Sequence, residues 1–398
     1  MSIKSSKIRI PRNVLIVAFV ALASGFGQDL ITPVLPAFLI ALGVGHAGIG
    51  VIDGLLQGAT SVTRFISGIL SDRFRNRKWF IFFGYFLSSI ARPLLALTNS
   101  FAPVAALRAV DGVGKGTKDA PRDALVADSA PETARGRAFG FHRLVDTAGS
   151  VFGPLAAAGL LLWLTPALRT YRIIFILASI PGAIALALIF FGIREPEQVK
   201  KTLQKLRRPF SWKFWFFIFG MTVAMLTKIN DSLFLARAHD IGIPSPWIPV
   251  LFAGFTLVYA VLSYPIGIWS DKFGKLPFIV AGWLVLSVVE YGFARGSTVG
   301  TAIILFAFYG LFFALTEGSG RAIIADLVPA EDRGSAYAIY NTFIGLAVII
   351  GGYGIGHVWD NISPNYAFSI SSYGSLFGFA VLLAMLILDR KKMPELAG

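Results

Sequence analysis

One charged phrase occurs once in each half of this chain, and it constrains the fold more than any other feature. Residues 68–74, Gly-Ile-Leu-Ser-Asp-Arg-Phe, return at 267–273 as Gly-Ile-Trp-Ser-Asp-Lys-Phe, 199 positions later (267 minus 68) in a chain of 398 residues. A second phrase, Ala-Asp followed after six residues by Arg-Gly, occurs at 127–136 and again at 325–334. Two phrases in the same order and at nearly the same offset indicate a duplicated sequence. The chain is therefore expected to fold as two similar halves.

Both halves consist mainly of apolar stretches. The sequence is 55% hydrophobic and only 15% charged, whereas a soluble domain carries about a quarter charged residues. Each stretch is long enough to cross a hydrocarbon core about 30 Å thick at 1.5 Å per residue. The twelve stretches lie at 13–42, 46–70, 79–98, 101–127, 138–164, 171–193, 212–238, 246–270, 277–294, 299–325, 335–358 and 366–388.

Twelve spans in a duplicated chain predict an all-α integral membrane protein built from two six-helix bundles. Because the charged phrases lie at equivalent helix ends in both halves, we expect a pseudo-two-fold axis along the membrane normal to relate the bundles. The predicted first bundle covers residues 1–193 and the second covers 212–398. Residues 194–211 between them are rich in Lys and Arg. They are interpreted as a cytoplasmic linker on the anionic lipid surface.

The basic residues predict the orientation. With the N-terminus inside, the segments on the inner side carry 23 Lys and Arg residues, and the loops on the outer side carry three, namely Arg169, Arg172 and Arg295. Cytoplasmic loops of membrane proteins are enriched in Lys and Arg. Both termini are therefore expected in the cytoplasm.

Other classes of function find little support in the sequence. It contains no Cys, and its four His residues lack the His-Glu-x-x-His spacing of a zinc site. No Gly-x-x-x-x-Gly-Lys-[Ser/Thr] loop is present, so ATP is not the expected energy source. The formal charge of +14 lies in short segments between spans, which indicates membrane topology rather than nucleic-acid binding. We expect no enzyme activity, no cofactor, no bound metal and no nucleic-acid partner.

Three phrases resemble signatures of the major facilitator superfamily, a family of membrane transporters. Residues 68–78 resemble its loop signature Gly-x-Leu-x-Asp-Arg-x-x-x-Arg-Lys. Residues 108–114 resemble its signature Arg-x-x-Gln-Gly-x-Gly, with Asp111 in place of Gln. The phrase 149–154, Gly-x-x-x-Gly-Pro, is similar to its antiporter signature, although Ala156-Ala157 replaces the usual Gly-Gly.

The resemblance implies two bundles that rock about a central site for a small molecule or ion. Residues 120–146 resemble a bacterial branch of the family, so we expect a monomer in the bacterial inner membrane. In the family, the carboxylate corresponding to Asp72 meets the N-terminus of helix 11, where free N–H groups and the helix dipole favour an anion. This contact latches the outward-open state. The predicted cytoplasmic gate consists of Gly68, Asp72, Arg73, Arg77, Asp128, Arg135, Gly267, Asp271, Lys272, Asp326 and Arg333. The alternative is that these charges only set the topology.

Several charged residues fall inside the predicted spans, where each is costly unless it faces water or a partner. Asp29 lies near the middle of the first span, and Asp231 occupies a roughly equivalent position in the seventh. The fourth span repeats charges at helical spacing, so one face of that helix is charged and is expected to line the central pathway. The predicted proton-coupling and substrate-cavity residues are Asp29, Asp53, Arg108, Asp111, Lys115, Asn230, Asp231, Glu317 and Arg321.

Buried carboxyls suit proton coupling. A carboxyl shielded from water holds its proton more tightly than a solvated one, so it can take up a proton in one conformation and release it in another. Asp29 and Asp231 suit this role best, because neither is followed by a cation one helical turn later in the sequence. In the alternative interpretation the charges only neutralise one another, in pairs such as Arg108–Asp111 and Glu317–Arg321.

These features favour a secondary active transporter that exports a small molecule or ion in exchange for protons. Gly149, Gly153 and Pro154 favour a bend of the fifth span that seals a leak path, and the alternative is ordinary close packing. The cations of the fourth span leave open the uptake of an anionic metabolite, metal chelate or siderophore. A receptor or scaffold without transport activity fits less well, because the gate phrase occurs in both halves.

Overall fold

The computed structural model describes residues 10–74, 76–131, 135–195, 210–296, 298–329 and 332–390. Within these ranges, it describes the backbone but not the side chain at residues 72, 135–136, 318–322, 325–326, 333–334 and 389–390. All regular structure in the described ranges is helical. The predicted all-α membrane fold with two bundles is confirmed.

The described part of the first bundle contains eight α-helices and a short 3₁₀ helix. They are α1 (Arg12–Ile31), α2 (Leu35–Ala41), α3 (His46–Phe74), α4 (Arg77–Leu94), η1 (Leu95–Leu97), α5 (Phe101–Ser129), α6 (Arg135–Leu164), α7 (Leu168–Leu177) and α8 (Ser179–Gly192). Within it, α1 packs on α6 and α8, and α5 packs on α3 and α4.

The described part of the second bundle contains the α-helices α9 to α15 and the 3₁₀ helix η3. They are α9 (Trp212–Thr227), α10 (Asp231–Asp240), η3 (Ser245–Trp247), α11 (Ile248–Phe273), α12 (Lys275–Ala294), α13 (Val299–Leu327), α14 (Arg333–Asn361) and α15 (Pro364–Arg390). Within it, α12 packs on α13 and α15, and α11 packs on α13. Most of the predicted linker 194–211 lies outside the described residues, so the proposed domain boundaries stand as sequence predictions.

Ten helical segments in the described ranges are long and apolar enough to cross a membrane. The two other predicted spans correspond to α3 and α5, which have 29 residues each. They have the required length, but they carry many polar and charged side chains. These polar side chains are tolerated because α3 and α5 line the cavities between the bundles and do not present a fully apolar surface to lipid.

Three spans in the described ranges are broken helices, and one of them is the sixth, which is split at Ala178 between α7 and α8. The first span is split at residues 32–34 between α1 and α2, close to Pro33 and Pro36. The seventh is split at residues 228–230 between α9 and α10. Here Asn230 is the N-cap of α10, and its side chain accepts a hydrogen bond from the N–H of Leu233 at 3.2 Å. Unpaired backbone at such breaks is tolerated in a membrane only where it is buried in protein or faces a cavity.

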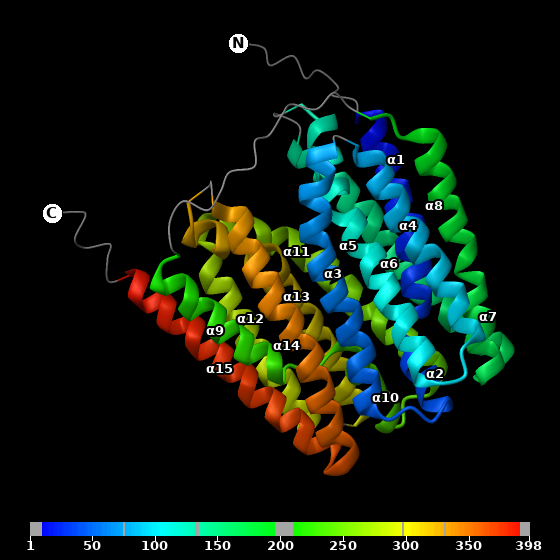
Figure 1. The fold of residues 1–398 in the computed structure, drawn as a ribbon. Helices are drawn as coiled ribbons and strands as arrows, with labels where there is room; N and C mark the ends of the chain where they lie inside the picture. Colours follow the sequence, from blue (N-terminus) through cyan, green and yellow to red (C-terminus); the bar gives the residue numbers. More distant parts are fainter. Residues whose placement is uncertain are drawn as a thin grey trace.

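The two bundles lie closest together at one end of the molecule. We define the basic end as the end of the molecule where Phe74, Arg77 and Phe273 lie, and the far end as the end where His46 and Asn361 lie. Figure 1 shows α3 of the first bundle running beside α14 of the second, and α6 also packs on α11. The contact between α3 and α14 closes the far end, as described below.

Candidate functional site

A cavity of about 1050 Å³, here called the vestibule, lies between the bundles on the side of the basic end. The first bundle contributes side chains from α1, α3, α4, α5 and α6, and the second contributes α11, α13 and the start of α12. Gly267, Ser270 and Asp271 line it near the basic end of α11. Its ionisable lining residues include Asp29, Arg64, Lys115, Lys118, Asp119, Arg122, Asp123, His142, Arg143, Asp146, Asp271, Lys275 and Glu317.

A second cavity of about 350 Å³, here called the inner chamber, adjoins the vestibule. The two cavities share four lining residues: Gln57, Ser61, Phe313 and Glu317. The broken seventh span faces the inner chamber through residues 228–231, and α3 contributes Asp53. Both predicted carboxyls of this region, Asp53 and Asp231, therefore line one cavity.

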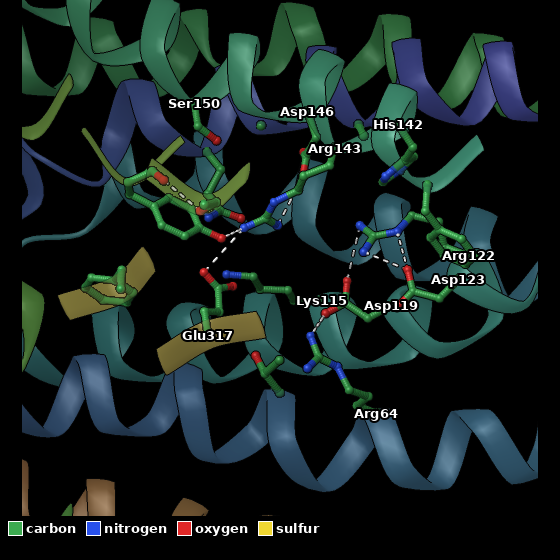
Figure 2. A pocket seen from close by; sticks show the side chains of 18 of the residues that line it. Arg64, Lys115, Asp119, Arg122, Asp123, His142, Arg143, Asp146, Ser150 and Glu317 are labelled. Atoms are coloured by element: carbon green, nitrogen blue, oxygen red, sulfur yellow. Dashed lines mark hydrogen bonds and ion pairs between the residues drawn. The ribbon is translucent and has the colours of Figure 1, made fainter. Parts of the chain in front are cut away.

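Most charges on α5 that reach the vestibule are neutralised within the first bundle. Asp119 pairs with Arg64 of α3 and with Arg122, whose Nη1 lies 3.5 Å from Asp119 Oδ1. Arg122 also pairs with Asp123 at 3.1 Å. Figure 2 shows these four side chains as one network at the side of the cavity. Such a network holds α3 against α5 and leaves little net charge for a ligand.

Three other ionisable groups of the vestibule have no ion-pair partner within 4.0 Å among the described side chains. Asp29 is 7% exposed, and its Oδ1 accepts a hydrogen bond from Thr32 Oγ1 at 3.3 Å. The Lys118 amine contacts Ser24 Oγ at 3.3 Å and lies 3.9 Å from the centre of the Tyr85 ring. Lys115 points into the cavity toward Glu317 (Figure 2). Among the described side chains, no Lys or Arg nitrogen lies within 4.0 Å of the Asp29 carboxylate.

Arg143 on α6 bridges the two bundles across the cavities. Its guanidinium donates a hydrogen bond to the hydroxyl of Tyr259 on α11 and lies 3.3 Å from Glu317 Oε2 on α13. Because Glu317 lines both cavities, this bridge lies where the vestibule meets the inner chamber (Figure 2). This bridge was not predicted from the sequence. A contact between helices of different bundles leaves no spacing pattern in a single sequence.

Arg108 and Asp111 lie outside the lining of both cavities, which differs from the sequence expectation for this face of α5. Asp111 is 2% exposed and lies between two arginines, with Arg108 Nη1 at 3.1 Å and Arg92 Nη2 at 3.5 Å. Arg92 comes from α4 and also donates to the carbonyl oxygen of Ser24 on α1. The cluster therefore joins three helices inside the first bundle, in agreement with the alternative interpretation of neutralised charges.

The far end is closed by glycine packing between α3 and α14. A Cβ atom on Gly50 would lie 1.9 Å from the carbonyl oxygen of Gly352, and one on Gly54 would lie 2.7 Å from Cα of Ile349. A Cβ on Gly356 would lie 2.4 Å from the carbonyl oxygen of His46. Only glycine allows two backbones to approach this closely. This contact was not predicted from the sequence, although Gly50, Gly54 and Gly58 recur at a spacing of four.

A carboxylate clamp adds to this closure at the outermost turn. Asp360 of α14 accepts hydrogen bonds from the backbone N–H groups of His46 and Ala47, at 3.0 and 2.9 Å. Its Oδ1 also lies 2.8 Å from His46 Nδ1, and the His46 ring stacks on Trp359. A carboxylate at the first turn of α3 is favoured by the free N–H groups and the dipole of that helix.

We predict that Asp360→Ala opens the far end more often. Losing these hydrogen bonds should cost about 1–3 kcal/mol, which corresponds to about 5- to 150-fold in the open population. The measurement is the rate at which a water-soluble maleimide labels Ile49→Cys, a position that is 0% exposed on α3. Asp240→Ala is the control, because Asp240 lies at the same end with His239 of its own helix as its ion-pair partner. Equal labelling in both variants would contradict the prediction.

Those predicted gate residues whose side chains the structure describes lie at the basic end. Arg77 pairs with Asp128 inside the first bundle, whereas Arg73, Asp271 and Lys272 are exposed. Gly68 faces the Cβ of Ala120 on α5, and Gly267 has open space around it. The described gate side chains make no contact between the bundles that closes this end. The structure does not describe the side chains of Asp72, Arg135, Arg321, Asp326 and Arg333, so the roles expected for them stay predictions.

The glycines of the predicted bend in the fifth span pack tightly on α1. A Cβ on Gly149 would lie 2.4 Å from the carbonyl oxygen of Leu22, and one on Gly153 would lie 2.5 Å from that of Phe26. Pro154 lies inside α6, which continues as one helix from Arg135 to Leu164. The glycines therefore bring α6 against α1, which agrees with the alternative interpretation of close packing.

A cavity between two bundles of broken and charged helices is typical of secondary transporters. The family model described as Major Facilitator Superfamily matches residues 17–236 and 216–398. The chain belongs to this superfamily. A major facilitator relative, an uncharacterized transporter of Methanocaldococcus jannaschii, is 29% identical over 388 residues and covers 95% of each chain.

Further similarities fit the same superfamily. The multidrug resistance protein MdtH of Yersinia pestis is 25% identical over 330 residues, which cover 81% of this chain and 80% of that relative. Among solved structures, the nucleoside transporter NupG superposes with a TM-score of 0.76 over 94% of this chain and 99% of its own. Its identity of 15% supports the fold alone. The protein is therefore a multi-pass membrane transporter of the major facilitator superfamily.

Proposed function

We propose that this major facilitator protein exports a small molecule in exchange for protons by alternating access. The observation that carries the proposal is Asp29, a carboxyl that is 7% exposed and lines the vestibule with only neutral hydrogen-bond partners described around it. A buried carboxyl without a fixed cation can change its protonation when water or cargo reaches it. Asp53 and Asp231 are second candidates for the same role in the inner chamber.

The proposed orientation places the basic end in the cytoplasm. The inner segments carry 23 basic residues against three in the outer loops, which supports this assignment. The vestibule then faces the cytoplasm and the closed far end faces the outside, as in an inward-facing state. Exchange to the outward-facing state requires that α3 separate from α14 and that the bundles approach at the basic end. We expect this cycle in a monomer surrounded by inner-membrane lipid.

Export is proposed because an inward-facing vestibule gives cytoplasmic cargo access to the carboxyls. Cargo that binds there would favour release of the proton to the cytoplasm, and outward-facing reprotonation would favour release of the cargo outside. The printed name of the MdtH relatives, multidrug resistance protein, agrees with export. Lys115 and Lys118 support a second candidate, uptake of an anionic metabolite or chelate, because no carboxylate is described in an ion pair with either amine.

The test uses purified protein in liposomes that contain a pH-sensitive dye. With an imposed pH gradient, panels of amphiphilic amines, acids and zwitterions should include compounds that drive proton movement. Asp29→Asn should slow this movement by about tenfold or more, because the amide cannot exchange a proton. The Asp29→Asn variant should still exchange cargo across the membrane when no pH gradient is imposed.

The matched control is Asp123→Asn, a vestibule carboxyl whose side chain is 44% exposed and paired with Arg122. It should change proton movement by less than about twofold. Equal proton movement in Asp29→Asn and the unmodified protein would remove Asp29 from the coupling mechanism. Movement of protons in the same direction as the cargo would replace export by the uptake candidate.

A further inference from the structure

We propose that the inner chamber binds an amphiphilic zwitterion, a small molecule that carries one ammonium and one carboxylate on an apolar body. This inference rests on the proposed transport function and names the class of cargo. It follows from three ionisable groups of the chamber, Asp53, Lys228 and Asp231, and from the apolar wall opposite them.

Each of the three groups contacts a neutral partner instead of an opposite charge. The Lys228 amine donates to the carbonyl oxygen of Ile229 at 3.2 Å. Asp231 Oδ1 accepts a hydrogen bond from the hydroxyl of Tyr309 on α13. The Asp53 carboxyl faces the backbone N–H of Ser232. Among the described side chains, no ion pair within 4.0 Å joins Lys228 to either carboxylate.

Unpaired opposite charges in one buried cavity need an explanation. In an apolar environment, a charge without a counterion is costly, so groups that only stabilise the fold pair directly. The vestibule does this with Arg64 and Asp119. In the inner chamber, the neutral partners instead leave a cation and two carboxylates available to a ligand. A ligand with both charges satisfies both sets, whereas an amine leaves Lys228 unpaired and an acid leaves the carboxylates unpaired.

The apolar wall predicts the body of the ligand. Phe217, Met221, Trp283, Phe312 and Tyr340 line the chamber from α9, α12, α13 and α14. Aromatic side chains favour ring-containing ligands through stacking and edge-to-face contacts, and methionine adapts to their shape. A volume of about 350 Å³ lies near the lower limit of ligand pockets, so the ligand should resemble an aromatic amino acid in size.

Such a ligand would also join the two bundles. Asp53 belongs to α3 of the first bundle, whereas Lys228 and Asp231 belong to the broken seventh span of the second. An ammonium at Asp53 and a carboxylate at Lys228 would therefore link the bundles through one molecule. A ligand that contacts both bundles can bias their relative position, as alternating access requires.

The test compares probes that share one skeleton. L-phenylalanine and L-4-phenylphenylalanine are the zwitterions, their methyl esters carry only the ammonium, and their N-acetyl derivatives carry only the carboxylate. Binding to the full-length protein in detergent is measured by calorimetry. The zwitterion of at least one pair should bind about tenfold or more tightly than both derivatives. This comparison needs no variant, so it is independent of folding defects.

Two variants then assign the charges. Lys228→Gln should weaken zwitterion binding by about tenfold or more and leave ester binding unchanged or tighter. Asp231→Asn should weaken the zwitterion and the ester but not the N-acetyl derivative. Melting temperatures identify a variant that fails to fold, and Asp53→Asn then replaces Asp231→Asn.

Two outcomes would overturn the inference while leaving the transport proposal intact. In the first, the ester binds as tightly as the zwitterion and Lys228→Gln does not weaken it, which would make the cargo an organic cation. In the second, none of the probes binds although other compounds drive proton movement in liposomes. Conversely, tight zwitterion binding without any gradient-driven movement would support the inference and overturn proton coupling.

Discussion

Gly352→Ala is expected to abolish most transport, whereas Gly354→Ala, two residues along the same helix, should leave transport nearly unchanged. A Cβ on Gly352 would lie 2.4 Å from the carbonyl oxygen of Gly50, so α14 could not reach α3 at the far end. A Cβ on Gly354 has open space around it. Overpacking at such a contact costs about 1–3 kcal/mol or more, so the closed far end should lose about 5- to 150-fold in population.

The measurement is proton movement driven by an active cargo in liposomes, with both variants reconstituted at equal density. Labelling of Ile49→Cys from the far end should increase in Gly352→Ala and not in Gly354→Ala. If Gly352→Ala transported cargo at the unmodified rate with Ile49→Cys still protected, the close approach of α3 and α14 would not be needed for closure.

Asp111→Asn is expected to destabilise the folded protein strongly. The substitution leaves Arg92 and Arg108 buried, at 2% and 3% exposure, without their shared counterion. Breaking a buried ion pair by removing one partner costs about 3–5 kcal/mol. Because Arg108 belongs to α5 and Arg92 joins α4 to α1, the loss should spread through the first bundle.

The thermal unfolding of the purified variant in detergent measures this effect. Asp123→Asn is the matched control on the same helix, because the Asp123 side chain is 44% exposed and its pair with Arg122 should contribute at most about 1 kcal/mol. A melting temperature of Asp111→Asn equal to that of the control would show that the cluster does not stabilise the bundle. The cluster of Arg92, Arg108 and Asp111 would then be a candidate for a role in proton coupling.

The twelve spans could be predicted because hydropathy and span length report directly on a bilayer. The predicted fifth span, 138–164, lies inside α6, and the predicted ninth, 277–294, lies inside α12. The break of the seventh span was not predicted, because residues 228–230 contain neither Gly nor Pro. A local signal existed in Asn230 before Asp231, which is typical of a helix start.

The residues of the site were only partly predictable. Helical spacing placed the charges of α5 on one face, but it could not tell which turns of that face are covered by α1 and α4. Lys115 reaches the vestibule, whereas Asp111 is enclosed by arginines. Similarly, Glu317 was expected to line the cavity, with Arg321 of its own helix as an alternative partner, and its described ion-pair partner is Arg143 of the other bundle. Partners on distant helices depend on packing, which one sequence does not record.

Distances between spin labels test the central claim most directly, because the sequence contains no Cys and introduced pairs label cleanly. One pair is Phe74→Cys with Phe273→Cys, both 64% exposed at the basic end. The other is Ala41→Cys with Ile362→Cys at the far end, on opposite bundles. When pH or cargo is changed, the basic-end distance should shorten while the far-end distance lengthens. Distances that stay fixed, or that change in the same direction at both ends, would contradict a cavity with alternating access.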